Sequence, residues 1–289
     1  MRPAQWVKNI FVLAPVAFAR GDVHLRHGDN RDLWHVGFAF LAFCLGASSI
    51  YLVNDLIDAN RDRAHPTKRL RPIASGELAV PVAAAASLVL AACALALAWQ
   101  AGGGKPGVIV VLGAYLVMNL AYGLLLKHLV MVDAFCIASG FLLRVKAGGL
   151  AAETYLSHWL MLCTLFLALF LALCKRRAEI DLLGEERGHH RANLREYTVG
   201  FIDQMVTLLA ATTIVCYTMY TVAEDTSEKY PGNHLIYSVP FVVFGLSRYM
   251  FLVSTQRGGG SPTRVLLGGD AMFVINAVAW AVVVATAIF

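Results

Sequence analysis

The sequence predicts an all-α membrane protein built from nine transmembrane helices. Of its 289 residues, 58% are hydrophobic and only 15% are charged, whereas soluble domains carry about 25% charged residues. Apolar runs of about 20 residues, long enough to cross a bilayer as helices, recur along the chain. No long linker separates them, so we expect one integral membrane domain over residues 1–289. The predicted spans are residues 6–19, 34–54, 79–100, 107–126, 130–149, 156–174, 198–222, 235–253 and 270–288.

The first span is the least regular of the nine, because it is short and contains Pro15. Arg2 lies before its apolar run and Lys8 lies near the start of that run. The Ala-Phe-Ala triplet at 17–19 resembles a signal-peptidase site. A cleaved signal peptide is therefore the alternative interpretation of this segment. We expect the segment to be retained as a helix.

Lys and Arg are distributed unevenly between the two sides of the predicted membrane. With the N-terminus in the cytoplasm, 16 of the 24 lie in cytoplasmic segments, five lie outside and three lie within spans. The positive-inside rule then places both large polar loops, about 55–78 and 175–197, in the cytoplasm. We expect a multi-pass protein of the cell (inner) membrane whose active site faces the cytoplasm. The net charge of +5 fits anionic lipids and substrates, and no soluble basic domain calls for nucleic acid.

The cysteines give no sign of a disulfide framework or a zinc site. No two of them form a C-x-x-C pair, and all six lie in apolar spans. We interpret them as small packing residues. They are Cys44, Cys93, Cys136, Cys163, Cys174 and Cys216.

A row of acidic and amide side chains follows the second span. If the helix continues past Val53, then Asn54, Asp58 and Asp62 lie one turn apart on one face, with Asp55 beside them. Carboxylates this close repel one another unless a cation neutralises them, and Mg²⁺ that also binds substrate phosphate is the natural choice. We therefore predict that Asn54, Asp58 and Asp62 are Mg²⁺ ligands and that these three and Asp55 are catalytic. The plainer interpretation is a solvated helix end of mixed charge.

Cations near both polar loops are candidate ligands of substrate phosphates, because Lys and Arg bind phosphate oxygens strongly. Arg144 lies inside the fifth span, where an ionisable group is costly and calls for a function or for snorkelling to the interface. For the cluster at 175–177, the alternative is that it only enforces the positive-inside rule. The candidate residues are Lys8, Lys68, Arg69, Arg71, Arg144, Lys175, Arg176 and Arg177.

These motifs resemble the UbiA superfamily of intramembrane prenyltransferases, whose first acidic motif has the form N-D-x-x-D-x-x-x-D. The resemblance covers essentially the whole chain in span number and loop placement. Segments 2–9 (R-P-x-Q-W-x-K-N) and 65–76 (H-P-x-K-R-x-R-P-I-A-S-G) are similar to one branch, the decaprenyl-phosphate phosphoribosyltransferases. The resemblance implies nine helices around a central cavity with cytoplasmic cap loops, and Mg²⁺ as the cofactor. It also implies transfer of 5-phosphoribose from phosphoribosyl pyrophosphate (PRPP) to a polyprenyl phosphate, such as decaprenyl phosphate, for cell-wall arabinan synthesis.

The chain departs from other UbiA enzymes at their second acidic motif, which follows the sixth span. Residues 175–181 read K-R-R-A-E-I-D here, so three cations precede two acids. Extra positive charge suits a donor and an acceptor that together carry three anionic groups. The resemblance also implies a substrate-binding role for Glu179 in this segment and for Lys127.

Two other functions stay open. Within the same fold, the alternative is a prenyltransferase that joins a prenyl diphosphate to an aromatic acceptor. From another class, the alternative is a lipid or anion transporter, although a translocation path needs polar residues open to both faces and both large polar loops lie on one side. The expected partners are PRPP, the lipid phosphate and the membrane, and a homo-oligomer is compatible with the sequence.

Overall fold

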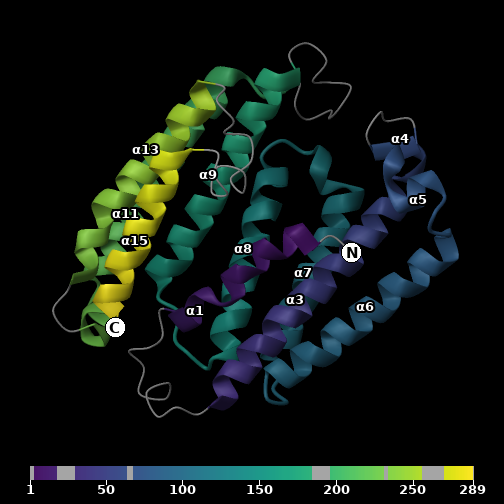
Figure 1. The fold of residues 1–289 in the computed structure, drawn as a ribbon, viewed down its shortest axis with the longest axis horizontal. Helices are drawn as coiled ribbons and strands as arrows, with labels where there is room; N and C mark the ends of the chain where they lie inside the picture. The colour runs from purple at the N-terminus through teal and green to yellow at the C-terminus, as the bar shows by residue number, and fades with distance from the viewer. Residues whose placement is uncertain are drawn as a thin grey trace. The chain divides into compact units, whose positions relative to one another are not determined.

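The computed structural model describes residues 3–17, 30–63, 68–183, 196–230, 234–255 and 270–288. Within these ranges the chain is helical and contains no β-strand, which confirms the predicted all-α class (Figure 1). Eight of the described helices are long and apolar enough to cross a membrane. They are α3 (Asn30–Ile57), α6 (Val80–Ala101), α7 (Gly107–Leu124), α8 (Val132–Ala151), α9 (His158–Leu183), α11 (Val199–Val222), α13 (Val239–Ser254) continued from η6 (His234–Ser238), and α15 (Ala271–Ile288). The short helices are α4 (Ala59–Arg63), η2 (Lys68–Leu70), α5 (Pro72–Ser75), η3 (Leu126–His128) and α12 (Glu224–Lys229).

The predicted first span is the one that differs. It forms a 3₁₀ helix, η1 (Pro3–Val12), and a single α-turn, α1 (Ala14–Ala17). Its apolar part, Trp6–Val16, is shorter than the other spans. Long 3₁₀ runs are uncommon because their hydrogen bonds are poorly aligned, so tertiary contacts must hold η1. The count of nine spans and the cytoplasmic cap loops therefore stay predictions.

The described chain packs as two compact units. Unit 1 takes the described residues up to Leu125 together with Leu143–Tyr155. Unit 2 takes Leu126–Leu142 and the described residues from Leu156 onward. Helix α8 therefore contributes its first half to unit 2 and its second half to unit 1. The expectation of a single domain stays a prediction.

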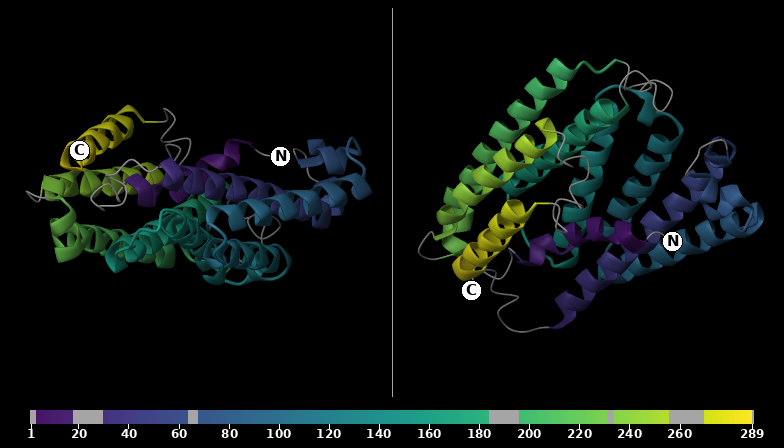
Figure 2. Two further views of the ribbon diagram at one scale, coloured as in Figure 1. Left: turned by 90° about the horizontal axis from the view of Figure 1, so that it is seen from below. Right: turned by 45° about the horizontal axis from the view of Figure 1, so that its top comes forward.

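Unit 1 is packed closely because small residues line its contacts. Helices α3 and α6 run side by side (Figures 1 and 2), and α6 turns a stripe of buried alanines inward. At Gly46 of α3, an added Cβ would lie 3.2 Å from Leu112 of α7. At Gly148 of α8, a Cβ would lie 1.9 Å from the carbonyl oxygen of Val12, so η1 meets α8 backbone to backbone. These contacts fix η1 in the same unit as the acidic motif.

Unit 2 is built on helices α9 and α11, whose facing side chains form its core. Phe170, Leu173 and Ile202 are fully buried there. Helices α13 and α15 are neighbours, and Arg248 of α13 contacts both carboxylate oxygens of Asp270, at 3.1 and 2.7 Å. Because Asp270 also accepts the N–H of Phe273, one carboxylate neutralises the arginine and caps α15.

Candidate functional site

The acidic motif spans the junction of two helices, because α3 ends at Ile57, Asp58 lies in a turn and α4 begins at Ala59. The N–H of Asp58 donates to the carbonyl of Asn54 at 2.9 Å, and the N–H of Asp62 donates to the carbonyl of Asp58 at 2.8 Å. These two i to i+4 bonds lie on either side of the turn between α3 and α4. The three residues are therefore linked by i to i+4 backbone bonds but do not belong to one uninterrupted helix, and their placement on one face stays a prediction.

Arg71 bridges two of the motif's carboxylates. Its Nη1 lies 3.0 Å from Oδ1 of Asp55 and 2.6 Å from Oδ2 of Asp62. Asp62 is buried, with 3% of its surface exposed, so it needs this partner. Pro72 holds Arg71 in an extended conformation at the start of α5 and so directs the chain back toward the motif. The sequence suggested phosphate binding for Arg71, and the structure shows it paired with the protein's own acids.

Asn54 is held close to helix α7. A Cβ added at Gly123 would lie only 2.2 Å from Oδ1 of Asn54. Only glycine allows the amide to take this position. The glycine thus determines where the first oxygen of the motif points.

A small pocket adjoins the motif within unit 1. Its volume is about 130 Å³, and both Asp55 and Arg71 line it. The residues from α3 are mostly polar, whereas those from α5 and the following turn are apolar. The lining residues are Ser48, Tyr51, Leu52, Asp55, Arg71, Pro72, Ile73 and Leu78.

The other cations predicted near this motif differ in placement. Arg69 is exposed in η2, Lys127 is half-buried in η3, and Lys8 is exposed on η1. The side chain of Lys68 lies outside the described residues, as do residues 64–67. The substrate roles of these four residues stay predictions.

Arg144 is buried in unit 1 and contacts polar groups rather than the interface. Its Nε donates to Oδ1 of Asn9 at 2.8 Å, and its Nη2 donates to the hydroxyl of Tyr115 at 2.9 Å. The guanidinium also lies 4.8 Å from the centre of the Tyr115 ring. With 7% of its surface exposed, Arg144 does not snorkel, whereas Lys146 on the same helix is exposed.

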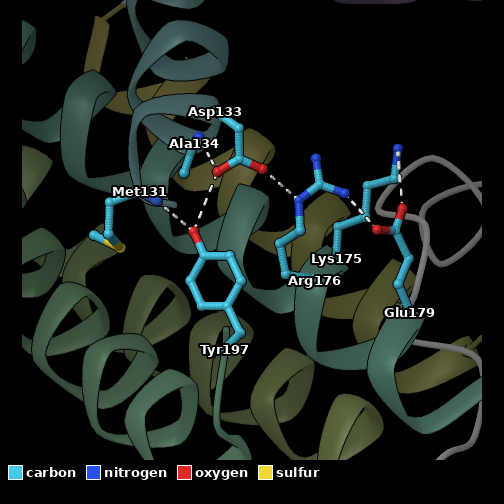
Figure 3. Close-up of polar contacts among 7 residues, drawn as sticks. All are labelled: Met131, Asp133, Ala134, Lys175, Arg176, Glu179 and Tyr197. Carbon is cyan, nitrogen blue, oxygen red and sulfur yellow. Dashed lines mark hydrogen bonds and ion pairs between the residues drawn. The ribbon is translucent and has the colours of Figure 1, made fainter. Parts of the chain in front are cut away.

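A second polar network lies in unit 2, around the end of α9 (Figure 3). The Nε of Arg176 donates to Oδ2 of Asp133 at 2.9 Å, and both side chains are essentially fully buried. Arg176 also pairs with Glu179, whose other oxygen lies 3.9 Å from Nζ of Lys175. Tyr197 donates to Oδ1 of Asp133 at 3.1 Å, which closes the network on the side of α11.

Arg177 points to a different set of acids. It pairs with Asp181 one turn further along α9 and with Asp203 of α11 at 2.8 Å. Together with Asp133 and Glu179, four acids therefore surround the three cations of segment 175–177. The extra positive charge that the sequence suggested is largely neutralised by the protein itself, and the substrate roles of these residues and Glu179 stay predictions.

The donor set of the first motif fits a hard divalent cation. Asn54 offers an amide oxygen and Asp55, Asp58 and Asp62 offer carboxylates, which are ligands that Mg²⁺ prefers. Within the described ranges, no three His, Cys, Asp or Glu side chains converge as a metal site. Arg71 supplies the positive charge between Asp55 and Asp62 instead. The assignment of metal ligands therefore stays a prediction.

Comparison with known proteins identifies the family. The model of the UbiA prenyltransferase family matches residues 12–185, which include both the acidic motif and the 175–181 segment. This chain belongs to the UbiA prenyltransferase family. Over its full length it is 37% identical to decaprenyl-phosphate phosphoribosyltransferase of Corynebacterium glutamicum, of which it covers 85%. It is also 35% identical to the protein of the same name from Mycolicibacterium smegmatis, of which it covers 91%.

The UbiA fold is also found among solved structures. A UbiA homolog from Archaeoglobus fulgidus bound to GPP and Mg²⁺ aligns with a TM-score of 0.72, covering 99% of this chain and 97% of that one. The two sequences are 18% identical, so this likeness establishes the fold alone. With eight apolar helices, membership of the UbiA family indicates a multi-pass membrane protein.

Three residues of this UbiA protein were missed by sequence reasoning. Asn9 and Tyr115 hold Arg144, and Gly123 admits Asn54. The signal for the first two was Arg144 itself, since a cation inside a span requires polar partners on neighbouring helices. No local pattern marked Gly123.

Proposed function

We propose that this protein transfers 5-phosphoribose from PRPP to decaprenyl phosphate or a similar polyprenyl phosphate, with release of diphosphate. The observation that carries the proposal is the 35–37% identity, over the whole chain, to proteins named decaprenyl-phosphate phosphoribosyltransferase. An acidic motif at the end of a membrane helix, bridged by an arginine, supports it, because a diphosphate donor needs both metal ligands and cations. By the same analogy, the product serves cell-wall arabinan synthesis.

In this proposal, Asn54, Asp58 and Asp62 hold Mg²⁺, and Asp55 assists. Bound there, Mg²⁺ would neutralise the diphosphate as its negative charge increases. Arg71 contacts the two acids through a single nitrogen, and a guanidinium has five N–H donors, so other donors can serve a phosphate oxygen. Lys68 and Arg69 lie close to Arg71 in the sequence and are further candidate phosphate ligands, as are Lys8 and Lys127.

The chemistry exchanges one C1–O bond of the ribose for another. The bond to diphosphate breaks, the anomeric carbon takes on oxocarbenium character, and an oxygen of the lipid phosphate forms the new bond from the opposite face. The configuration at C1 inverts. The lipid phosphate is already anionic near neutral pH, so no general base is required. Catalysis then depends on positioning and charge stabilisation.

A direct test gives purified protein PRPP and decaprenyl phosphate and measures the lipid product. We expect Asp58→Ala to lower turnover by about 100-fold or more, the usual effect of removing a group that stabilises transition-state charge. Excess chelator should have the same effect on the wild type. Asp225→Ala, which removes an exposed carboxylate from α12, is the matched control and should retain activity. Full activity in chelator would exclude the metal-dependent mechanism.

A prenyltransferase reaction is the second candidate, because the matching fold occurs in a UbiA homolog bound to GPP and Mg²⁺. Offering the protein a prenyl diphosphate with aromatic acceptors separates the two. Product from this pair, and none from PRPP with the lipid phosphate, would replace the proposed function with this one.

We also propose that the acidic motif faces the cytoplasm, where water-soluble PRPP is available. The lipid phosphate would then enter laterally with its chain left in the bilayer. Cysteines introduced at Glu77 and Lys105, both exposed, test this sidedness with impermeant thiol reagents. Glu77→Cys should react only in inside-out vesicles and Lys105→Cys only in right-side-out vesicles. The opposite pattern would reverse the topology.

A further inference from the structure

The three consecutive cations of α9 differ sharply in exposure. The side chain of Lys175 is 49% exposed, that of Arg177 is 14% exposed and that of Arg176 is 1% exposed. Arg177 is tied to Asp181 and Asp203. Three neighbouring residues of like charge therefore have three different surroundings, and only Lys175 has substantial access to a solute.

Arg176 is held by a carboxylate that is itself fixed from several directions. Oδ2 of Asp133 accepts from Arg176, while Oδ1 accepts from the N–H of Ala134 at 2.8 Å and from the Tyr197 hydroxyl (Figure 3). The same hydroxyl accepts the N–H of Met131 at 2.7 Å. Met131 has φ of 65°, a left-handed conformation that costs energy for a residue other than glycine. The Tyr197 hydroxyl thus stabilises the strained turn at Met131 and also orients the Asp133 carboxylate.

Glu179 connects this buried pair to Lys175. One of its oxygens pairs with Arg176, and the other lies 3.9 Å from Nζ of Lys175 (Figure 3). Because Arg176 shares the negative charge of Glu179 and the Lys175 ammonium lies 3.9 Å away, the ion pair between Glu179 and Lys175 is weak. An ammonium at this distance can turn to a phosphate without leaving Glu179 unpaired.

We propose that Asp133 and Arg176 are a positioning pair and that Lys175, alone among the three cations, contacts a substrate phosphate. The pair fixes Glu179 and thereby keeps the Lys175 ammonium in place and available. Without Arg176, Glu179 would draw Lys175 into a tight ion pair of its own. This inference rests on the proposed function for the identity of the phosphate, which is PRPP.

A double-mutant cycle tests the division of roles. The pair variant Asp133→Asn/Arg176→Gln removes both buried charges together, so that neither is left uncompensated. We expect Lys175→Gln to raise KM for PRPP about tenfold, the effect of one charge-assisted contact. The pair variant should raise KM for PRPP by a similar factor. The triple variant, which adds Lys175→Gln to the pair variant, should raise KM no further than Lys175→Gln alone, because all three changes act through the Lys175 ammonium. Lys175→Arg should retain most of the affinity, and Lys105→Gln, in an exposed pair elsewhere, should leave KM unchanged.

The proposal would be overturned if the increases in KM from Lys175→Gln and from the pair variant multiplied in the triple variant. It would also be overturned if Lys175→Gln left KM unchanged. A second measurement needs no substrate turnover. Acylation of Lys175 by a water-soluble reagent should be several-fold slower in the pair variant than in the wild type, since Glu179 then holds the ammonium more tightly. Lys105 serves as the internal reference. An unchanged rate would refute the positioning pair, whereas a wild type that forms no product from PRPP would refute only the proposed function and the identity of the phosphate.

Discussion

Gly123→Ala is the smallest change that should separate activity from stability in this protein. The new methyl would lie 2.2 Å from Oδ1 of Asn54, and Cβ contacts below 3.0 Å essentially never occur. The amide must therefore move by about 0.8 Å, the difference between these two distances. A displacement near 1 Å at a catalytic group can lower a rate by about 10²-fold, and we expect a loss of this order.

The effect on stability should be modest. Replacing glycine by alanine within a helix stabilises it by about 1 kcal/mol, and the added crowding costs about 1–3 kcal/mol. Gly113→Ala on the same helix is the matched control, because nothing lies within 4 Å of its added Cβ. It should keep full activity and unfold at an equal or higher temperature. Initial rates and thermal unfolding temperatures of the two variants test this prediction. Full activity of Gly123→Ala would show that the position of Asn54 does not matter for catalysis.

Three further predictions concern the ion pairs and the tyrosine. Arg71→Gln should lower the free energy of unfolding by about 2 kcal/mol, between the values for exposed and buried pairs, and adding Asp62→Asn should recover much of this in thermal unfolding. Tyr197→Phe should cost about 1–2 kcal/mol. Burial raises the pKa of Tyr197 to about 12. The loss of unfolding free energy in Tyr197→Phe should therefore be constant near neutral pH and become smaller above about pH 10, where the tyrosine of the unfolded chain ionises. Hydrogen bonds from Arg248 lower the pKa of Asp270, so the stability difference between wild type and Arg248→Gln should be complete above about pH 4 and vanish as the pH falls further.

Features that depend on local backbone geometry were predictable from the sequence. The span at 198–222 is helix α11, Val199–Val222, and i to i+4 bonds link the backbone of Asn54, Asp58 and Asp62. Hydropathy reports burial in lipid or protein, and turn periodicity follows from the helix itself. Hydropathy does not distinguish an α-helix from a 3₁₀ helix, and so the first segment was predicted as a full span.

The pairing of charges was not predictable, because it depends on residues distant in sequence. Arg176 meets Asp133 across 43 residues, and Arg71 reaches back nine residues to Asp62. A count of cations in a loop suggests phosphate binding, yet it does not show which of them the protein's own acids neutralise. In the structure, the three cations of segment 175–177 have different sets of acidic partners and do not form a uniform cluster.

The contacts of Arg144 have a consequence for how the chain enters the membrane. An arginine near the middle of a helix opposes insertion by about 2.5–3.5 kcal/mol on the translocon scale. Its hydrogen-bond partners, Asn9 and Tyr115, come from segments that are synthesised earlier, and they bind it at 2.8 and 2.9 Å. The Arg144 side chain of α8 therefore finds its hydrogen-bond partners only when η1 and α7 are already in the membrane. Insertion should follow the order of synthesis, with the N-terminal segment assisting an arginine that lies 135 residues downstream of its partner Asn9.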